Sequence, residues 1–410
     1  MRIRMILLGL IMATTGCYAQ LTLQECRQKA HDNYPLIKQY DLVERLRDYN
    51  IANASVANLP QVSVTGLTTY HTDMIKGNLP STFDTKNYIY GGMLQVSQSV
   101  YDGGAVTARK KITKADANVS SEQLNVSMYD VNSRVDQMFF GTLLLDEQIK
   151  QNKLLQEDLA LSRKNVEAMM KNGIANQSDI DAIKVEQLNA EQQMKSMMEQ
   201  RHSYIMMLAI FIGEKLDDGT TFSRPSGDMP ESMEVKRPEL KLFDAQTILL
   251  NEREKALDVN LKPKFGLFVS GLWGNTGLDM INKSMLMAGA KLTWNIGGLY
   301  TRKNDKRQIE ANRQQIEGNR ETFLFNTRLQ TAGETSVIND LKQKIQTDDA
   351  IVVLRTSIRS KAERKVANGT LTINEMLRQI NAESEAKQAK ALHEVQLLKE
   401  IYQLKNIGNY

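Results

Sequence analysis

The sequence predicts a mainly α-helical fold made of two copies of one unit, in which a pair of strands is followed by a long helical hairpin. Three observations predict it. Landmarks in the first half of the 410-residue chain recur in the second half, in the same order and at nearly the same spacing. Each copy begins with two stretches that alternate apolar and polar residues, as half-buried strands do. The remainder carries apolar residues at spacings of three and four, as packed helices do.

The first residues have the pattern of a secretory signal. Arg2 and Arg4 are followed by an apolar stretch over 5–13, and the small residues before Gln20 fit cleavage after Ala19. The alternative is a lipoprotein signal with Cys17 acylated. Both predict that the chain leaves the cytoplasm. After this segment no apolar run approaches the roughly 20 residues of a membrane-spanning helix, so a membrane span would have to be built from strands.

Composition argues against several classes of protein. Lysine and arginine are spread along the chain, with a net charge of only +4, so no nucleic-acid surface is expected. The four histidines are far apart, and the cysteines are Cys17 and Cys26 alone, so we expect no metal, no cofactor and no disulfide framework. Cys26 is expected to be a small buried residue in a helix. No catalytic triad, phosphate-binding glycine loop or paired carboxylates suggest an enzyme.

The duplication rests on three pairs of landmarks. The segments are 59–67 and 262–272, then 96–104 and 292–298, and finally Asn172-Gly173 with Ser178-Asp179 and Asn368-Gly369 with Asn374-Glu375. Self-similarity of this kind predicts a fold built from two copies of one structural unit.

The predicted strands cover about 62–70, 90–100, 265–273 and 286–296. Each is about 10 residues long, the length of a tilted strand that crosses a bilayer. Tyr70, Tyr101, Trp273 and Trp294 lie near their ends, where aromatic residues of a membrane interface would be. A sheet with one face in water is the alternative. Four strands are too few to enclose a barrel, so the membrane interpretation requires an oligomer.

The predicted helices are long and come in hairpins. The segment from Gly104 to Asn172 would measure roughly 100 Å as a helix, and Leu299 to Asn368 roughly 105 Å. Gly173 and Gly369 suit left-handed turns at the hairpin ends. Ser178 and Thr372 are candidate N-caps of the returning helices.

The returning helices are too short to match the long ones. Residues 178–213 and 372–406 each cover about half the length, and 238–260 and 35–58 provide the missing halves. This arithmetic predicts a cylindrical wall about 100 Å tall, with both chain termini beside a loop rich in glycine, proline and serine at 219–230.

The chain resembles the TolC-like outer-membrane efflux proteins over essentially its whole mature length. The segments that carry the resemblance are Leu21 to Cys26 with Ala30 and Asn33-Tyr34-Pro35, then Ala57 to Pro60, and Tyr101-Asp102-Gly103-Gly104. The resemblance implies a mainly α fold with a transmembrane β-barrel. It implies a homotrimer in which four strands per subunit close a twelve-stranded barrel in the outer membrane, above a periplasmic helical tunnel. The trimer would be a passive export duct of a tripartite efflux or type I secretion system, without enzymatic activity, coupled to a periplasmic adaptor (membrane-fusion) protein and an inner-membrane pump.

These expectations divide the chain into segments: a signal peptide (1–19), N-terminal helices (20–58), a first strand pair (59–104), a first helical hairpin (105–213), an equatorial loop (214–236), an upper tunnel helix (237–262), a second strand pair (263–298), and a second hairpin with the C-terminal equatorial segment (299–410).

The resemblance also implies site residues. The hairpin ends would form the periplasmic entrance and dock the adaptor through Asn172, Gly173, Ile174, Asn368, Gly369, Thr370 and Leu371. Glu375 matches an acidic position of the pore constriction, and a trimer would make it a ring of three carboxylates that favours cations. Arg378 departs from the acidic residue usual there, and pairing with Glu375 is the alternative. Asp179 matches an acidic latch position, but Val366 and Leu371 replace its usual partners. Ordinary solvated surface remains an alternative for all three charges.

Two other classes fit part of the pattern. An adaptor protein carries one hairpin between compact β-domains, whereas this chain predicts two hairpins. A periplasmic coiled-coil scaffold would not need four amphipathic strands of bilayer-crossing length. The sequence does not distinguish among drugs, metal ions, secreted proteins and polysaccharide precursors as the exported cargo.

Overall fold

The computed structural model describes residues 20–70, 88–275 and 284–410. The expected signal peptide, with Ala19 and Cys17, lies outside this range. The chain forms two compact units. One comprises Met1–Ile37, Met128–Lys236 and Thr327–Tyr410, and is called the hairpin unit here. The other comprises Lys38–Ser127 and Arg237–Asn326, and is called the sheet unit.

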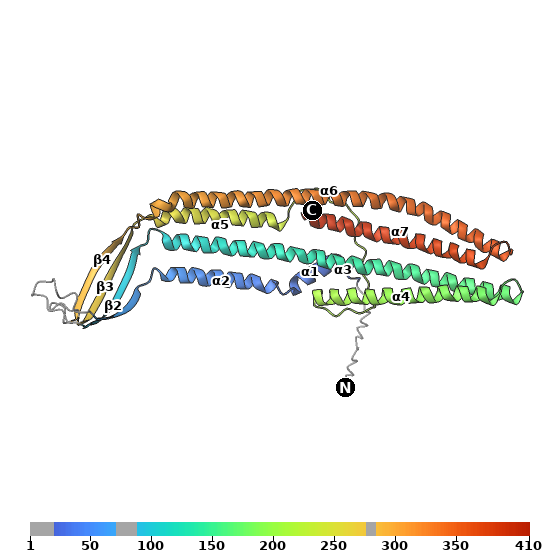
Figure 1. Ribbon diagram of the computed structural model, residues 1–410, viewed down its shortest axis with the longest axis horizontal. Coiled ribbons are helices and arrows are strands. Elements are labelled where there is room, and N and C mark those ends of the chain that lie inside the picture. The colour runs from blue at the N-terminus through green and yellow to red at the C-terminus, as the bar shows by residue number, and fades with distance from the viewer. Residues whose placement is uncertain (1–19, 71–87, 276–283) are drawn as a thin grey trace, which may run out of the picture. The chain divides into compact units, whose positions relative to one another are not determined.

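The order of elements follows the predicted duplication (Figure 1). The elements are α1 (Leu23–Asn33), α2 (Ile37–Val56), β1 (Gln61–Tyr70), β2 (Tyr88–Tyr101), α3 (Ala105–Lys171), α4 (Gln177–Ile212), α5 (Pro238–Asn260), β3 (Lys264–Asn275), β4 (Met285–Thr293), α6 (Gly298–Ala367) and α7 (Ile373–Gly408). Two strands, one very long helix and a shorter returning helix thus occur twice, which confirms the two strand–strand–hairpin repeats. Within the described ranges, no helix has the length and apolar character needed to cross a membrane.

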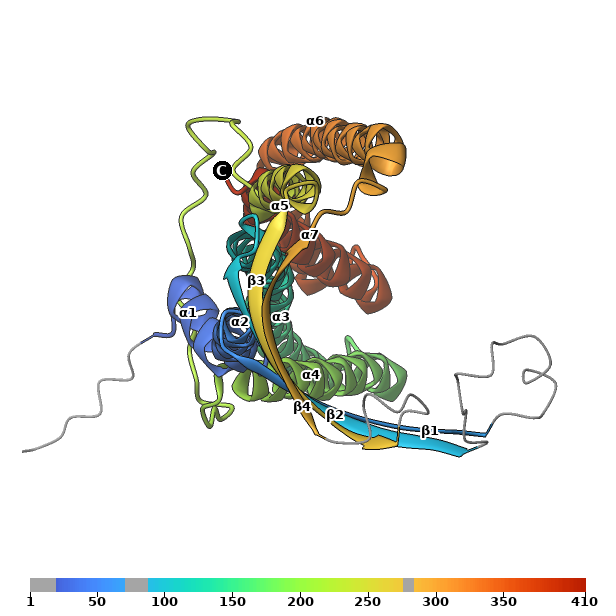
Figure 2. The ribbon, with the colours of Figure 1, turned by 90° about the vertical axis from the view of Figure 1, so that its left-hand side faces the viewer.

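The four strands of the sheet unit form one antiparallel sheet in the order β1-β2-β3-β4, which Figure 2 shows as a curved ribbon. The register aligns apolar residues in rows across all four strands. One row is Val62, Val96, Val269 and Ala288, and the next is Val64, Leu94, Gly271 and Leu286. The residues between these rows point to the opposite face and are mostly small or polar, among them Ser63, Gln95 and Ser270. The sheet therefore has one apolar and one more polar face.

Among the described residues, nothing covers the apolar face of the sheet. Val64 is 71% exposed, Val62 65% and Leu286 77%. Both edge strands, β1 and β4, lack a partner on their outer side in the described sheet. Exposed apolar patches and open edges are costly in water, so a partner that covers this face and pairs these edges would stabilise the sheet.

In the hairpin unit, α1 packs against α3 and α4 around a core of aromatic and aliphatic side chains. Phe139 and Phe140 of α3 are fully buried, with Ile205 and Leu208 of α4 and Cys26 of α1. Burial raises the pKa of the Cys26 thiol to about 12, so the thiol stays protonated and unreactive. This agrees with the buried role expected from the sequence.

A second core joins the two hairpins near their turns. It contains Leu159 and Val166 of α3, Ile180 and Ile183 of α4, Val366 of α6, and Ile373, Met376, Leu377 and Ile380 of α7. Figure 1 shows α3–α4 and α6–α7 ending in turns on the same side. The hairpins therefore pack as one body near these turns.

Leu21, near the start of the described residues, and Gly408, near the C-terminus, both bond to the segment between α4 and α5, as the length argument predicts. The Leu21 amide donates to the Thr221 carbonyl at 3.0 Å, and the Ser223 amide donates to the Leu21 carbonyl at 3.0 Å. Near the other end of the chain, the Lys236 amide donates to the Gly408 carbonyl at 2.7 Å.

Candidate channel entrance

The two hairpin turns have the same backbone geometry. Gly173 and Gly369 adopt left-handed conformations with φ of 72° and 67°. The Ile174 amide donates to the Met169 carbonyl and the Gly173 amide to the Met170 carbonyl, both at 3.0 Å. The second turn repeats this pattern through the amides of Gly369 and Thr370. Both are Schellman motifs, which satisfy the last carbonyls of a helix and fix where the chain turns.

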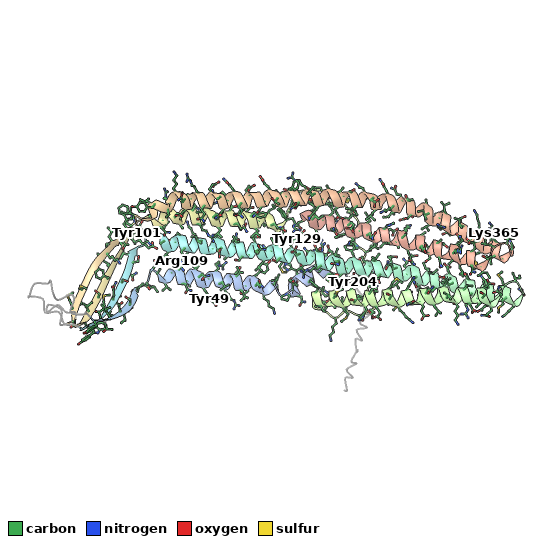
Figure 3. The ribbon with its side chains drawn as sticks, viewed as in Figure 1. Tyr49, Tyr101, Arg109, Tyr129, Tyr204 and Lys365 are labelled. Atoms are coloured by element: carbon green, nitrogen blue, oxygen red, sulfur yellow. The ribbon has the colours of Figure 1, made fainter. Side chains whose placement is uncertain are left out.

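The turns present most of the expected docking residues to solvent. Asn172, Gly173, Asn368, Gly369 and Thr370 are exposed, and Ile174 is an apolar side chain that is 56% exposed. Leu371 differs, because it is half-buried against the core that joins the hairpins. Figure 3 marks Lys365 beside the second turn. The turns thus have a hydrogen-bonded backbone, are exposed, and present one apolar side chain, Ile174, which suits docking of another protein.

The helix that follows the first turn begins earlier than the sequence predicts. Ser178 was the expected N-cap, but the N-cap is Asn176. The Asn176 side chain accepts a hydrogen bond from the Asp179 amide at 3.2 Å, and the Asp179 carboxylate accepts one from the Asn176 amide at 2.9 Å. This reciprocal capping box satisfies two amides that the helix leaves unpaired, and it decides the start of α4. In the second hairpin Thr372 caps α7, as predicted.

The structure brings Glu375 and Arg378 together. The Arg378 guanidinium lies 3.4 Å from the Glu375 carboxylate, and the Gln379 amide donates to the same carboxylate at 2.9 Å. Arg378 remains 79% exposed, so the pair is weak and readily exchanged. Asp179 makes no hydrogen bond or ion pair with either residue in the described part of the chain.

Sequence reasoning missed a buried ion-pair network among three helices of the hairpin unit. The Arg359 guanidinium of α6 lies 2.6 Å from Asp158 of α3 and 3.0 Å from Glu383 of α7. Glu383 is only 2% exposed and also accepts from Thr356 at 2.7 Å and Lys387 at 2.8 Å. The hydrogen bond to Asp158 is the main cause that raises the pKa of Arg359. A signal existed, because Glu383 continues the three-four spacing of the buried Ile373, Met376 and Ile380.

A second buried carboxylate lies between α6 and α7. Glu334 is 9% exposed, and one of its oxygens accepts from Gln403 at 3.1 Å while the other has no partner among the described residues. Burial, followed by the nearby Glu400 carboxylate, raises the pKa of Glu334 to about 7. This group therefore titrates near neutral pH.

Comparisons with known proteins agree with the geometry. Residues 26–208 match the sequence model of the family described as outer membrane efflux protein. No curated protein matches the chain in sequence.

Solved structures share the fold at low identity. A crystal structure of CusC, described in connection with transmembrane channel formation, is 14% identical, with a TM-score of 0.72 over 95% of this chain and 92% of that one. The outer membrane protein VceC from Vibrio cholerae is 11% identical, with a TM-score of 0.68 over 94% and 96%. The open state of the MtrE outer membrane channel of Neisseria gonorrhoeae is 12% identical, with a TM-score of 0.67 over 94% and 88%.

At these identities the structural matches establish the fold, and the sequence match to the family model is confined to residues 26–208. Residues 26–208 match the model of the outer membrane efflux protein family, and the duplicated strand–strand–hairpin chain, with its amphipathic sheet and paired hairpin turns, has the fold of these solved outer membrane channels.

Proposed function

We propose that this chain is one subunit of a homotrimer that forms a passive export duct across the outer membrane, open to the periplasm at its hairpin turns. The observation that carries the proposal is the four-stranded sheet with an uncovered apolar face and two open edges. Three copies supply twelve strands, and joining β4 of one copy to β1 of the next removes every edge. Lipid then covers the apolar rows.

Uncovered helix faces support the oligomer. On α6, the exposed Ile351, Leu354 and Ile358 recur at spacings of three and four, so they share one side of the helix. On α4, Val185, Leu188, Met206 and Ile210 share one side, because 18 residues make five turns. Such stripes suit helix-to-helix packing between copies of the chain.

The hairpin turns are the proposed docking surface for a periplasmic adaptor protein that couples the duct to an inner-membrane pump. The supporting features are the two Schellman turns, the exposed apolar side chain of Ile174, and the exposed turn residues Asn172 and Asn368. Replacement of Ile174 by aspartate should weaken adaptor binding about tenfold or more, because a charge would replace an apolar contact. Surface plasmon resonance with the cognate adaptor measures this. Unchanged binding would exclude Ile174 from the surface.

Glu375 is proposed to line the entrance, with Arg378 moderating its charge. In a trimer, three carboxylates converge and favour cations. Single-channel recording in planar bilayers tests the duct and this ring together. The proposal expects a stable trimer with small conductance, and reduced cation preference in Glu375→Gln. A protein that stays a monomer and never inserts would overturn the channel proposal.

A further inference from the structure

The four strands are almost free of charge. Within β1, β2, β3 and β4, the only charged side chains are Lys264 of β3 and Lys291 of β4, and no strand contains an aspartate or glutamate. A charged residue in a strand that crosses a membrane is costly unless it faces water. The face of the sheet on which these two lysines lie therefore indicates which side meets water and the solutes that pass the sheet.

Both lysines lie on the polar face of the sheet. Lys264 pairs with Thr293, and Lys291 pairs with Gly266, so the two lysines occupy neighbouring rungs. Along β3, Lys264 and Ser270 are an even number of residues apart, so both point to the polar face. Phe265, Leu267 and Val269 alternate with them and point to the apolar face. Side chains on one face at diagonal positions are within reach of one another. The two ammonium groups thus form one positive spot beside the helix-linked end of β3 and β4.

Asp102, just after β2, interacts electrostatically with Lys264 and offsets part of this positive charge. Both lysines are exposed, and neither forms an ion pair within the described residues. The end of the sheet borders a cavity of about 430 Å³ whose lining includes Lys262, Lys264, Arg302 and Asp305. The Arg302 guanidinium is held by Asp258 at 2.7 Å. At the end of β2, the Asp102 carboxylate accepts backbone hydrogen bonds from Gly104 and Val106, both at 2.7 Å.

We propose that Lys264 and Lys291 form a cationic ring inside the barrel that attracts anionic groups of the cargo and determines ion preference at this level of the duct. The inference rests on the proposed trimeric channel. With the apolar rows facing lipid, the polar face lines the lumen, and three subunits place six ammonium groups around it. Cargo that carries carboxylate, phosphate or sulfate groups would be concentrated there.

Reversal potentials of single channels in a potassium chloride gradient test the ring. The double variant Lys264→Gln with Lys291→Gln should shift the chloride-to-potassium permeability ratio toward potassium by roughly twofold or more. The matched control, Lys264→Arg with Lys291→Arg, keeps the charge and should keep the wild-type ratio. The difference in permeability ratio between the wild type and the glutamine double variant should shrink in about 1 M salt, because the Debye length there is about 3 Å.

The outcomes separate this inference from the function on which it rests. Channels that conduct normally but show the same reversal potential in the glutamine double variant would overturn the lysine ring and leave the duct intact. A wild-type protein that forms no channel would overturn the duct and the ring with it.

A labelling experiment gives a second, independent readout. In membranes that contain the wild-type protein, a membrane-impermeant amine reagent small enough to enter the lumen should modify Lys264 and Lys291. Protection of both lysines from it would place them away from the aqueous lumen and contradict the proposal.

Discussion

At the residue scale, the buried charges of the hairpin unit differ from the charges at its turns. Glu375 and Arg378 are solvated and weakly paired, whereas Arg359, Glu383 and Glu334 are enclosed between helices. Enclosed charges are costly unless each has partners. Arg359 belongs to α6 and its partners Asp158 and Glu383 belong to α3 and α7, so this network links the two hairpins.

Removal of Arg359 should be costly. Arg359→Ala removes the cation that Glu383 and Asp158 share and leaves Glu383 with Lys387, so the cost is at most the roughly 3–5 kcal/mol of a broken buried pair. The control is Arg163→Ala, which removes an exposed partner of Glu167 and should cost less than about 1 kcal/mol. Denaturant unfolding followed by circular dichroism compares them. Equal losses in the two variants would contradict a structural role for the network.

Glu334 should make stability depend on pH. Its pKa is raised to about 7 in the folded protein against a reference of 4.5, so the folded state binds the proton more tightly than the unfolded state. This contribution is fully present below about pH 4.5 and is lost as pH rises to about 7, with an upper size on the order of 3 kcal/mol. Lys399, Glu400 and Gln403 of α7 are the groups that act on it.

Hydrogen exchange of the last turns of α7, corrected for intrinsic rates, measures the effect. Protection should fall between pH 5 and 8 in the wild type. Glu334→Gln should flatten that dependence, because the amide stays neutral. Glu385→Gln, at an exposed position of α7, should leave the dependence unchanged. An unaltered pH profile in Glu334→Gln would rule the group out as its source.

At the element scale, helix ends decide where the hairpins turn. Two Schellman turns, the capping box that begins α4 and the Thr372 N-cap that begins α7 fix them. The sequence indicates both turns correctly from Asn172-Gly173 and Asn368-Gly369. It misplaces the first N-cap, because Asn176 and Ser178 are both favourable cap residues and only the reciprocal bond with Asp179 selects between them.

The capping assignment predicts an asymmetric pair of variants. Asn176→Ala should destabilise the α4 terminus by about 1 kcal/mol, because the Asp179 amide loses its acceptor. Ser178→Ala should cost less than about 0.5 kcal/mol, since its exposed side chain has no capping role. Exchange rates of the amides at the start of α4 test both. A larger loss of stability in Ser178→Ala than in Asn176→Ala would instead identify Ser178 as the N-cap of α4.

At the scale of the whole molecule, the exposed apolar stripe of α6 should be an interface between subunits. Replacing Ile351, Leu354 and Ile358 by glutamate should block trimer formation, because three charges would be buried against a neighbouring chain. Lys342→Glu, at an exposed position outside the stripe, should leave the trimer intact. Light scattering in detergent gives the mass. A trimer that survives the triple change would exclude this stripe.

The sequence by itself determined the repeat, the strand pairs, the hairpins and the family resemblance. The strands and hairpins follow from local periodicity and spacing, which depend only on neighbours along the chain, whereas the repeat and the resemblance follow from short segments that match one another or the family's pattern. Tertiary structure decided what depends on contacts between distant segments. The apolar rows across four strands, the enclosure of Arg359 with Glu383, the raised pKa of Glu334 and the placement of Lys264 and Lys291 on one face are of this kind. Burial and electrostatic energy depend on which surfaces meet, and a linear pattern does not contain that information.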